Sequence, residues 1–399
     1  MNVPEGWKLL PISDLCSCII DCVNKTAPVV DYETPYKMIR TTNVRNGRVD
    51  TKNVRFVAEE TYINWIRRGK PQSGDLIFTR EAPVGEVGIL EDAEGVFLGQ
   101  RTVMYRAHPS KSNNLFILYS LQSNFCQKQI EDFSNGGTVS HVRVPDCSEI
   151  LIRSPSLPEQ QKIAKILSSW DKTIEKLDAL IATKKKRKKA LMQQLLTGKK
   201  RFSGFDGQWK YLKANELFKT ISQKKNGNAD ELLAVTQDQG VLPRSLLERR
   251  VVMPDGSTEG YKLVVPGNFI ISLRSFQGGL EYSNYRGLVS PAYTILKPII
   301  KISDDFYRHY FKSYDFIGHL AVAVIGIRDG KQISYEDFSF LKLPYPSLEE
   351  QHKIASVLSS ADAETEAHQK QLMALKEQKK GLMQQLLTGK KRVHIDKEA

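Results

Sequence analysis

The sequence predicts an α+β protein in which two mixed α/β modules are each followed by one long α-helix. Three observations lead to this prediction. A nearly identical segment occurs twice, both copies carry apolar residues at helical spacing, and short strand and turn patterns precede each copy. We expect the two helices to pair as an antiparallel coiled coil, which would relate the two halves of the chain by a pseudo-twofold axis.

The duplicated segment is the clearest feature of the chain. Residues 157–202 align without a gap on residues 348–393, with 25 identities in 46 positions. Eleven of the identities are consecutive, because LMQQLLTGKKR occurs at Leu191–Arg201 and again at Leu382–Arg392. Agreement over this length indicates an internal duplication.

Each copy is expected to form a helix of about 40 residues, since its apolar residues recur at steps of three and four. Glu159 and Glu350 lie in acidic first turns, and Gly198 and Gly389 precede cations at the other end, as helix termini favour. The alternative is that each helix packs only on its own module. The apolar positions expected to serve for pairing and docking are Ile163, Ile166, Trp170, Leu191, Leu195, Ile354, Val357, Leu382 and Leu386.

The stretches between the helices resemble each other only faintly. Gly74–Arg80 and Gly267–Arg274 both follow a turn-then-strand pattern that ends in arginine. Strands are expected around Ile77, Val87, Val103, Ile270 and Ile295, and a helix near the end of each module at Leu115–Ser123 and Phe306–Tyr314. The two modules have diverged from each other, whereas the two helices have not. This contrast indicates that the modules have different targets and that the helices share one docking role.

These patterns divide the chain into six segments. The predicted segments are a first module at 1–155, a helix at 156–201, a linker at 202–207, a second module at 208–346, a helix at 347–392 and a tail at 393–399.

Composition narrows the class of protein. The 399 residues have a net charge of +13, which favours a polyanionic partner, but much of the excess lies between Glu159 and Arg201. No apolar run reaches the length of a membrane helix, and no secretory signal is visible. Five cysteines, at positions 16, 18, 22, 126 and 147, are an odd number. They favour a reducing cytoplasm over a disulfide framework, and their spacing does not favour a metal site.

The sequence contains no recognisable catalytic motif. It has no glycine-rich phosphate loop, no GxSxG, no HExxH and no Pro-Pro of the kind found in amino-methyltransferase motifs. Asp329-Gly330-Lys331 ends like a nuclease motif, but no suitably spaced Pro-Asp precedes it, so a turn is the better interpretation.

Polar loops in both modules instead favour DNA recognition. Arginine reads guanine, asparagine and glutamine read adenine, and hydroxyl groups contact bases or phosphates. The alternative for each residue is a solvated loop. The candidates in the first module are Arg40, Thr41, Thr42, Asn43, Arg45, Arg80, Arg101, Thr138, His141 and Arg143. Those in the second are Gln237, Gln239, Arg274, Ser275, Gln277, Arg328, Lys331 and Gln332.

The basic run Lys184–Lys189 has two interpretations. Six consecutive cations cover every side of a helix, which is typical of a solvated stretch. The same run could contact phosphates between the modules.

These residues resemble the specificity subunits of type I restriction-modification systems over nearly the whole length. The most specific elements are the twin Leu-x-Glu-Gln-x-Lys-Ile-Ala segments at 157–164 and 348–355 and the twin LMQQLLTGKKR helix ends. Glycine-rich stretches at 74–88 and 274–279 also look like the target-recognition domains of this family.

The resemblance implies that each module reads one half of a split double-stranded DNA target. It implies two methyltransferase subunits docked on the helices, with restriction and translocase subunits joining the complex. The chain would hold no cofactor; S-adenosylmethionine, ATP and Mg would act in the partner subunits, and adenine methylation and cleavage would be their reactions.

Two other functions remain open from the residues. One is the recognition half of a fused restriction-methyltransferase, which only a truncated chain would fit. The other is a coiled-coil scaffold that joins two protein-binding modules; salt-dependent binding of duplex DNA would distinguish recognition from scaffolding.

Overall fold

The structure is a computed structural model, which describes residues 3–134, 140–223, 231–237, 239–247, 260–323 and 333–395. It divides into two compact units. Unit 1 is Met1–Leu177 with Gln371–Ala399, and unit 2 is Asp178–Lys370. Each unit therefore combines one module with one part of each long helix. Among the described residues, no helix has the length and apolarity needed to cross a membrane.

The module of unit 1 is built on a six-stranded sheet with the order β2-β10-β7-β8-β5-β4. Its strands are β2 (Cys16–Asp21), β10 (Thr102–Ala107), β7 (Leu76–Arg80), β8 (Val84–Ile89), β5 (Gly47–Val49) and β4 (Val44–Arg45). All neighbours are antiparallel except β5 and β8. The central strand β7 is buried over four of its five residues, as a strand covered on both faces should be. The strands predicted around Ile77, Val87 and Val103 are confirmed.

Smaller elements complete this unit. β1 (Lys8–Pro11) pairs with β11 (Leu151–Ser154), and β3 (Lys37–Ile39) lies between β6 (Arg55–Phe56) and β9 (Val96–Leu98). The helices are α1 (Ile12–Leu15), α2 (Glu59–Trp65), α3 (Asn114–Leu121), α4 (Asn124–Ser134) and α5 (Val144–Ser148), with short 3₁₀ turns at Thr41–Asn43 and Ile66–Arg68. The helix predicted at Leu115–Ser123 is therefore confirmed as α3.

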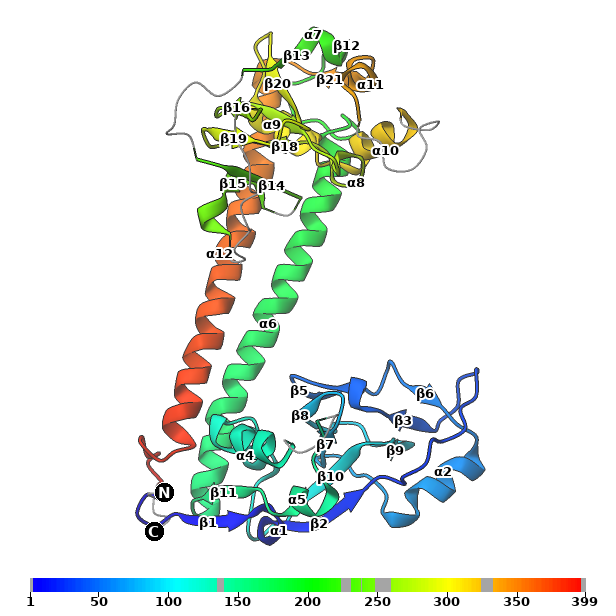
Figure 1. Cartoon of the computed structure of the whole chain (residues 1–399), viewed down its shortest axis with the longest axis vertical. Coiled ribbons are helices and arrows are strands. Elements are labelled where there is room, and N and C mark those ends of the chain that lie inside the picture. Colours follow the sequence, from blue (N-terminus) through cyan, green and yellow to red (C-terminus); the bar gives the residue numbers. More distant parts are fainter. Residues whose placement is uncertain are drawn as a thin grey trace. The chain divides into compact units, whose positions relative to one another are not determined.

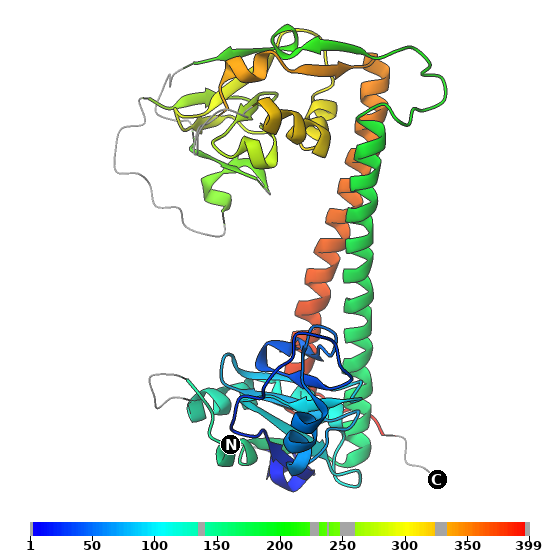
Figure 2. The same ribbon diagram turned by 90° about the vertical axis from the view of Figure 1, so that its right-hand side faces the viewer.

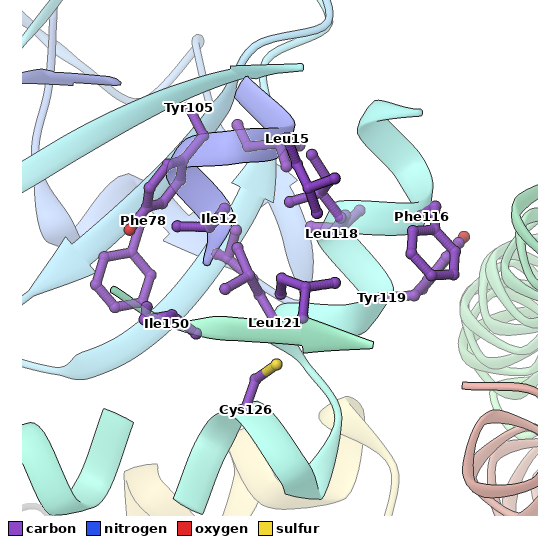
Figure 3. Packing of buried hydrophobic residues seen from close by; sticks show 14 of the residues in the cluster. Ile12, Leu15, Phe78, Tyr105, Phe116, Leu118, Tyr119, Leu121, Cys126 and Ile150 are labelled. Atoms are coloured by element: carbon purple, nitrogen blue, oxygen red, sulfur yellow. The ribbon is translucent and has the colours of Figure 1, made fainter. Parts of the chain in front are cut away.

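The main core of unit 1 lies between this sheet and α3. Figure 3 shows Phe78 and Tyr105 from the sheet facing Ile12 and Ile150, with Leu121 from α3 beside them. The same cluster includes residues from both long helices, among them Ile163 and Leu386. The helix ends are thus part of the hydrophobic core of the module.

Unit 2 repeats this plan. Its four-stranded sheet has the order β13-β20-β17-β18, which matches the first four strands of unit 1 in arrangement, and β12 pairs with β21 as β1 pairs with β11. The strands are β12 (Lys210–Lys213), β13 (Phe218–Ile221), β14 (Leu233–Thr236), β15 (Gly240–Pro243), β16 (Lys262–Val264), β17 (Phe269–Ile271), β18 (Glu281–Tyr282), β19 (Gly287–Val289), β20 (Thr294–Pro298) and β21 (Lys342–Tyr345). The strands predicted around Ile270 and Ile295 are confirmed.

The helices of this module are α7 (Ala214–Leu217), α8 (Ser275–Gly278), α9 (Asp304–Tyr310), α10 (Tyr314–Ala323) and α11 (Tyr335–Ser339), with a 3₁₀ turn at Arg244–Leu246. The helix predicted at Phe306–Tyr314 is present as α9, but it ends at Tyr310 because α10 starts a new helix at Tyr314. The core is aromatic: the Phe218 ring lies within about 6 Å of the Phe269, Tyr307 and Phe311 rings.

The two predicted long helices are α6 (Leu157–Leu195) and α12 (Leu348–Leu386), each of 39 residues (Figure 1). Each is followed by a glycine with positive φ, Gly198 or Gly389, and the amide two residues after that glycine donates to a carbonyl of the last helical turn. Within unit 2, the end of α6 lies beside the start of α12 and the two run antiparallel (Figure 2). In unit 1 the start of α6 shares the core with the end of α12.

Twin ion pairs join the ends of the helices. The guanidinium of Arg201, after α6, donates to both carboxylate oxygens of Glu350 at the start of α12, at 2.6 and 2.8 Å. In unit 1, Arg392 donates to Glu159 in the same way, at 2.7 and 2.8 Å. Both carboxylates are buried. This explains why glutamate opens and arginine closes each copy of the duplicated segment.

Candidate nucleic-acid interface

The β4–β5 hairpin carries the first group of predicted DNA contacts. Its turn at Asn46-Gly47 has positive φ at both residues, 53° and 79°, as a tight two-residue hairpin requires. Arg45 precedes the turn and is exposed, so its guanidinium is available to a ligand. Arg48 follows the turn and pairs with Glu91 and Glu175, which fixes the hairpin against α6 within unit 1.

Two predicted contacts in this region are corrected by the structure. Asn43 is buried, its side-chain oxygen accepts the Arg40 amide at 3.0 Å, and its NH₂ donates to the Asn53 carbonyl at 2.8 Å. Thr41 is buried and donates to the Ala82 carbonyl at 2.9 Å. Their polar groups are used to hold the turn before β4, so they are structural residues. Arg40 is half-buried and Thr42 is exposed beside them.

Arg80 and Arg101 lie next to each other at the end of β7. The Arg80 amide donates to the Arg101 carbonyl at 2.9 Å, and the Arg80 guanidinium donates to the Val142 carbonyl at 3.0 Å. Arg80 is half-buried and supports the loop that contains Val142, so the structure favours a positioning role for it. Arg101 is exposed, has φ 70° and pairs with Glu81 at 3.1 Å.

The polar loop before α5 is described only in part. Thr138 lies outside the described residues. His141 and Arg143 are exposed, and Arg143 donates to both oxygens of Asp146, at 2.7 and 2.9 Å. That pair is on the surface, so DNA could compete for the guanidinium at little cost.

In unit 2 the predicted residues gather around α8 and the β14–β15 hairpin. The Gln237 amide donates to the Arg274 carbonyl at 3.1 Å, so the hairpin tip and the α8 turn are in contact. Gln237, Gln239, Arg274 and Gln277 are exposed. Ser275 is buried and its hydroxyl accepts the Ser272 amide at 2.8 Å, so the predicted contact by Ser275 is corrected to a turn-forming role. Arg328, Lys331 and Gln332 lie outside the described residues.

The predicted docking residues on the helices need a larger correction. Ile163 and Leu386 are buried in the core of unit 1, and Leu195 and Ile354 in that of unit 2. Ile166, Leu382, Leu191 and Val357 are half-buried against the same clusters, and Trp170 is half-buried on α6. The apolar stripe therefore holds the helices to the modules. A partner would have to use other faces.

A site that the sequence patterns did not reveal lies in unit 2, between the module and the helices. It is a cavity of about 690 Å³ between the β14–β15 hairpin, α9 and both helices. Lys185 and Lys189 of the basic run line it, together with Arg308 and Lys312 from the α9 region. The corresponding signal in the sequence is the basic residues of α9, which lie on a helix and not in a polar loop.

Burial raises the pKa of three of the five cysteine thiols. All five are free, and burial raises the pKa of Cys126 and Cys147 to about 12. Burial, and then the neighbouring Cys18, raises the pKa of Cys16 to about 12 as well. Such thiols stay protonated at neutral pH. In the part of the chain that the structure describes, no three His, Cys, Asp or Glu side chains lie together as metal ligands would.

Comparisons with known proteins agree with this architecture. The family described as type I restriction modification DNA specificity domain matches residues 4–190 and 207–377. The chain is 26% identical to the putative type I restriction enzyme MjaX specificity subunit of Methanocaldococcus jannaschii, over 98% of this chain and 95% of that protein. The type I restriction enzyme EcoKI specificity subunit of Escherichia coli is 22% identical over 57% of this chain and 50% of its own length.

Solved structures show the same fold. The S subunit of a type I restriction-modification system from M. genitalium superposes with a TM-score of 0.59 at 17% identity, covering 96% of both chains. The HsdS subunit from Thermoanaerobacter tengcongensis gives 0.51 at 18% identity over 98% of both. The family match takes in both modules and most of both helices, and specificity subunits are not enzymes. The chain therefore belongs to the type I restriction-modification DNA specificity family, as a non-catalytic recognition subunit.

Proposed function

We propose that this chain reads a bipartite double-stranded DNA target, one half with each module, for a type I restriction-modification complex. The proposal rests on a difference between the exposed side chains of the two duplicated modules. The two modules share the order of their main strands, yet their hairpins present different exposed side chains, Arg45 in one and Gln237 and Gln239 in the other. The same scaffold with different exposed polar groups is what two separate half-sites require.

The repeated helices support a common partner for both halves. Buried identities follow from packing, but exposed ones do not. Gln193 and Gln194 are exposed on α6, and the same residues recur as the exposed pair Gln384 and Gln385 on α12. Since these amides contribute to no core, their repetition favours one kind of protein docking at two equivalent surfaces.

We therefore assign two methyltransferase subunits to these surfaces, with restriction and translocase subunits joining the larger complex in the cytoplasm. The methyl donor S-adenosylmethionine, and ATP with Mg, would bind in those partners. This chain would recognise the DNA and thereby position the catalytic centres of those subunits on it.

DNA binding by the full chain, purified with its methyltransferase partner, tests this function directly. We expect binding to a duplex that carries the target. The logarithm of the affinity should fall steeply and linearly as the logarithm of the salt concentration rises. Arg274→Ala should weaken binding to the target more than to an unrelated duplex. An assembly that binds no duplex at low salt, while still binding the methyltransferase, would favour the protein scaffold.

A further inference from the structure

The duplication places a cavity at equivalent positions in the two units, and the two cavities can be compared residue by residue. The unit 1 cavity, of about 260 Å³, lies between the β4–β5 hairpin, α3 and both helices. The unit 2 cavity, of about 690 Å³, lies between the β14–β15 hairpin, α9 and both helices. Both contain the same interhelical ion pair, Lys379 with Asp171 and Lys188 with Asp362, each at 2.5 Å.

In unit 1 the charges of the cavity are matched. Its lining has three basic and three acidic side chains. Arg48 reaches in from the hairpin and pairs with Glu91 and with Glu175 of α6. Tyr119 of α3 donates to Asp171 at 2.7 Å. The cavity is small because Arg48 and its two partners occupy the space between hairpin and helix.

The corresponding residues in unit 2 are more basic. The N-caps of α3 and α9, Asn113 and Ser303, set the correspondence, since each side chain accepts the amide three residues later. From that alignment Leu118 corresponds to Arg308, Tyr119 to His309 and Gln122 to Lys312. The strand pairing β7–β8 and β17–β18 likewise aligns Glu91 with Asn284, which removes a carboxylate.

The result is an excess of positive charge in unit 2. The lining has five lysine or arginine side chains and three carboxylates. Asp362 pairs with Lys188, Glu281 with Lys312, and Glu366 with Lys370. Lys185 and Lys189 have neither an ion pair nor a hydrogen bond within the described residues. The cavity thus holds two exposed ammonium groups, with the exposed amides of Gln237 and Gln239 also lining it.

The low pKa of His309 agrees with an excess of positive charge around the cavity. Burial, followed by the charges of Lys188 and Arg308, lowers the pKa of His309 to about 4, although Asp362 opposes this. Two ammonium groups that have no ion pair within the described residues, beside an open space, match the chemistry of a phosphate group, which takes hydrogen bonds and charge on several oxygens.

We propose that this cavity binds a phosphate of the DNA backbone through Lys185 and Lys189. The inference rests on the proposed function, since it names a backbone contact of the same DNA. It gives unit 2 a contact, independent of base sequence, that unit 1 lacks, because there Arg48 fills the equivalent space.

The test is the salt dependence of duplex binding by the full chain with its methyltransferase partner, for wild type and K185Q/K189Q. Glutamine keeps helix propensity and both positions are exposed, so the fold should be retained. We expect the slope of log affinity against log salt to fall by about 1, because one phosphate contact is lost, and affinity to fall roughly tenfold, equally for target and unrelated duplexes.

Two control variants remove the same charge elsewhere. K186Q/R187Q lies on the same run but outside the cavity, and K376Q/K380Q changes the duplicated lysines, which do not line the unit 1 cavity. Both should keep nearly the wild-type slope. An equal loss in K186Q/R187Q would overturn the site in favour of general charge.

The remaining outcomes separate the two levels of the proposal. No duplex binding by the wild-type complex would defeat the proposed function itself. Wild-type binding with an unchanged slope in K185Q/K189Q would defeat only this site. If ATP or inorganic phosphate bound to wild type and not to K185Q/K189Q, while DNA binding stayed unchanged, the cavity would be a site for a free phosphate ligand and the DNA contact would be wrong.

Discussion

Arg201 and Glu350 are 149 positions apart in the chain, yet they form a bidentate ion pair with N–O distances of 2.6 and 2.8 Å. Trp209 donates a third hydrogen bond to the same carboxylate at 2.9 Å. Glu350 is 1% exposed, so these three donors replace its hydration. The duplicated pair Arg392–Glu159 has the same geometry, but the indole nitrogen of Trp7 has no partner within the described residues.

Loss of Arg201 should therefore be costly. Arg201→Met leaves a buried carboxylate without its main partner, and we expect the free energy of unfolding to fall by about 3 kcal/mol. Denaturant unfolding of the full chain measures this. Replacing both partners, as in R201M/E350M, removes the buried charge as well and should recover much of the loss. A double variant at least as unstable as the single one would contradict the explanation.

The low pKa of His309 makes unit 2 sensitive to acid. Its pKa is about 4 in the folded chain, below the ordinary value of 6.5, because burial and then Lys188 and Arg308 disfavour the charged ring. The contribution of His309 to the free energy of unfolding is complete above pH 6.5 and is lost as the pH falls toward 4. Between these pH values the His309 ring takes up a proton in the unfolded chain but not in the folded chain. The loss should be on the order of 3 kcal/mol.

Thermal unfolding between pH 7 and pH 4 measures this effect, with His309→Tyr as the comparison. Tyrosine is the residue at the corresponding position 119 of unit 1, where it donates to Asp171. The variant should lose less stability across this range than the wild type. Identical pH profiles would show that other groups cause the acid sensitivity.

Gly279 should not tolerate a side chain. Its φ is +74°, and an added Cβ would lie 1.7 Å from the Phe311 carbonyl oxygen. Gly279→Ala should therefore destabilise unit 2 by several kcal/mol, since both backbones would have to move. Gly318 is the matched control, because it lies within α10 and its Cβ would meet nothing within 4 Å. Gly318→Ala should raise the melting temperature slightly. Equal effects of the two substitutions would contradict the close approach.

Much of the fold followed from local sequence. The helix pattern, the acidic first turns and Gly198 and Gly389 predicted α6 and α12 to within a few residues, because capping and periodicity act over short distances. What periodicity could not show is which surface a stripe covers. Ile163 and Leu386 were predicted for pairing and docking, but they complete the core of a module. Packing partners far apart in the sequence leave no local signal.

The candidate interface was predicted less completely for a similar reason. Residue type showed that Asn43, Thr41 and Ser275 could bind a base, but their hydrogen bonds are used within turns, which only the folded backbone shows. Conversely, the sequence shows Lys185 and Lys189 only as members of a run of like charge, which is typical of a solvated helix. Their surroundings depend on α9 and a hairpin that lie elsewhere in the sequence.

The exchange of one module tests the central claim most directly. Residues 1–155 of this chain would be replaced by the corresponding module of another specificity subunit, with both helices and the methyltransferase partner unchanged. Methylated adenines would then be mapped across the genome of a host that carries the hybrid. The account predicts that one half of the methylated sequence changes to that of the donor while the other half stays the same. A hybrid that methylates DNA with both halves changed, or with neither changed, would contradict recognition of one half-site by each module.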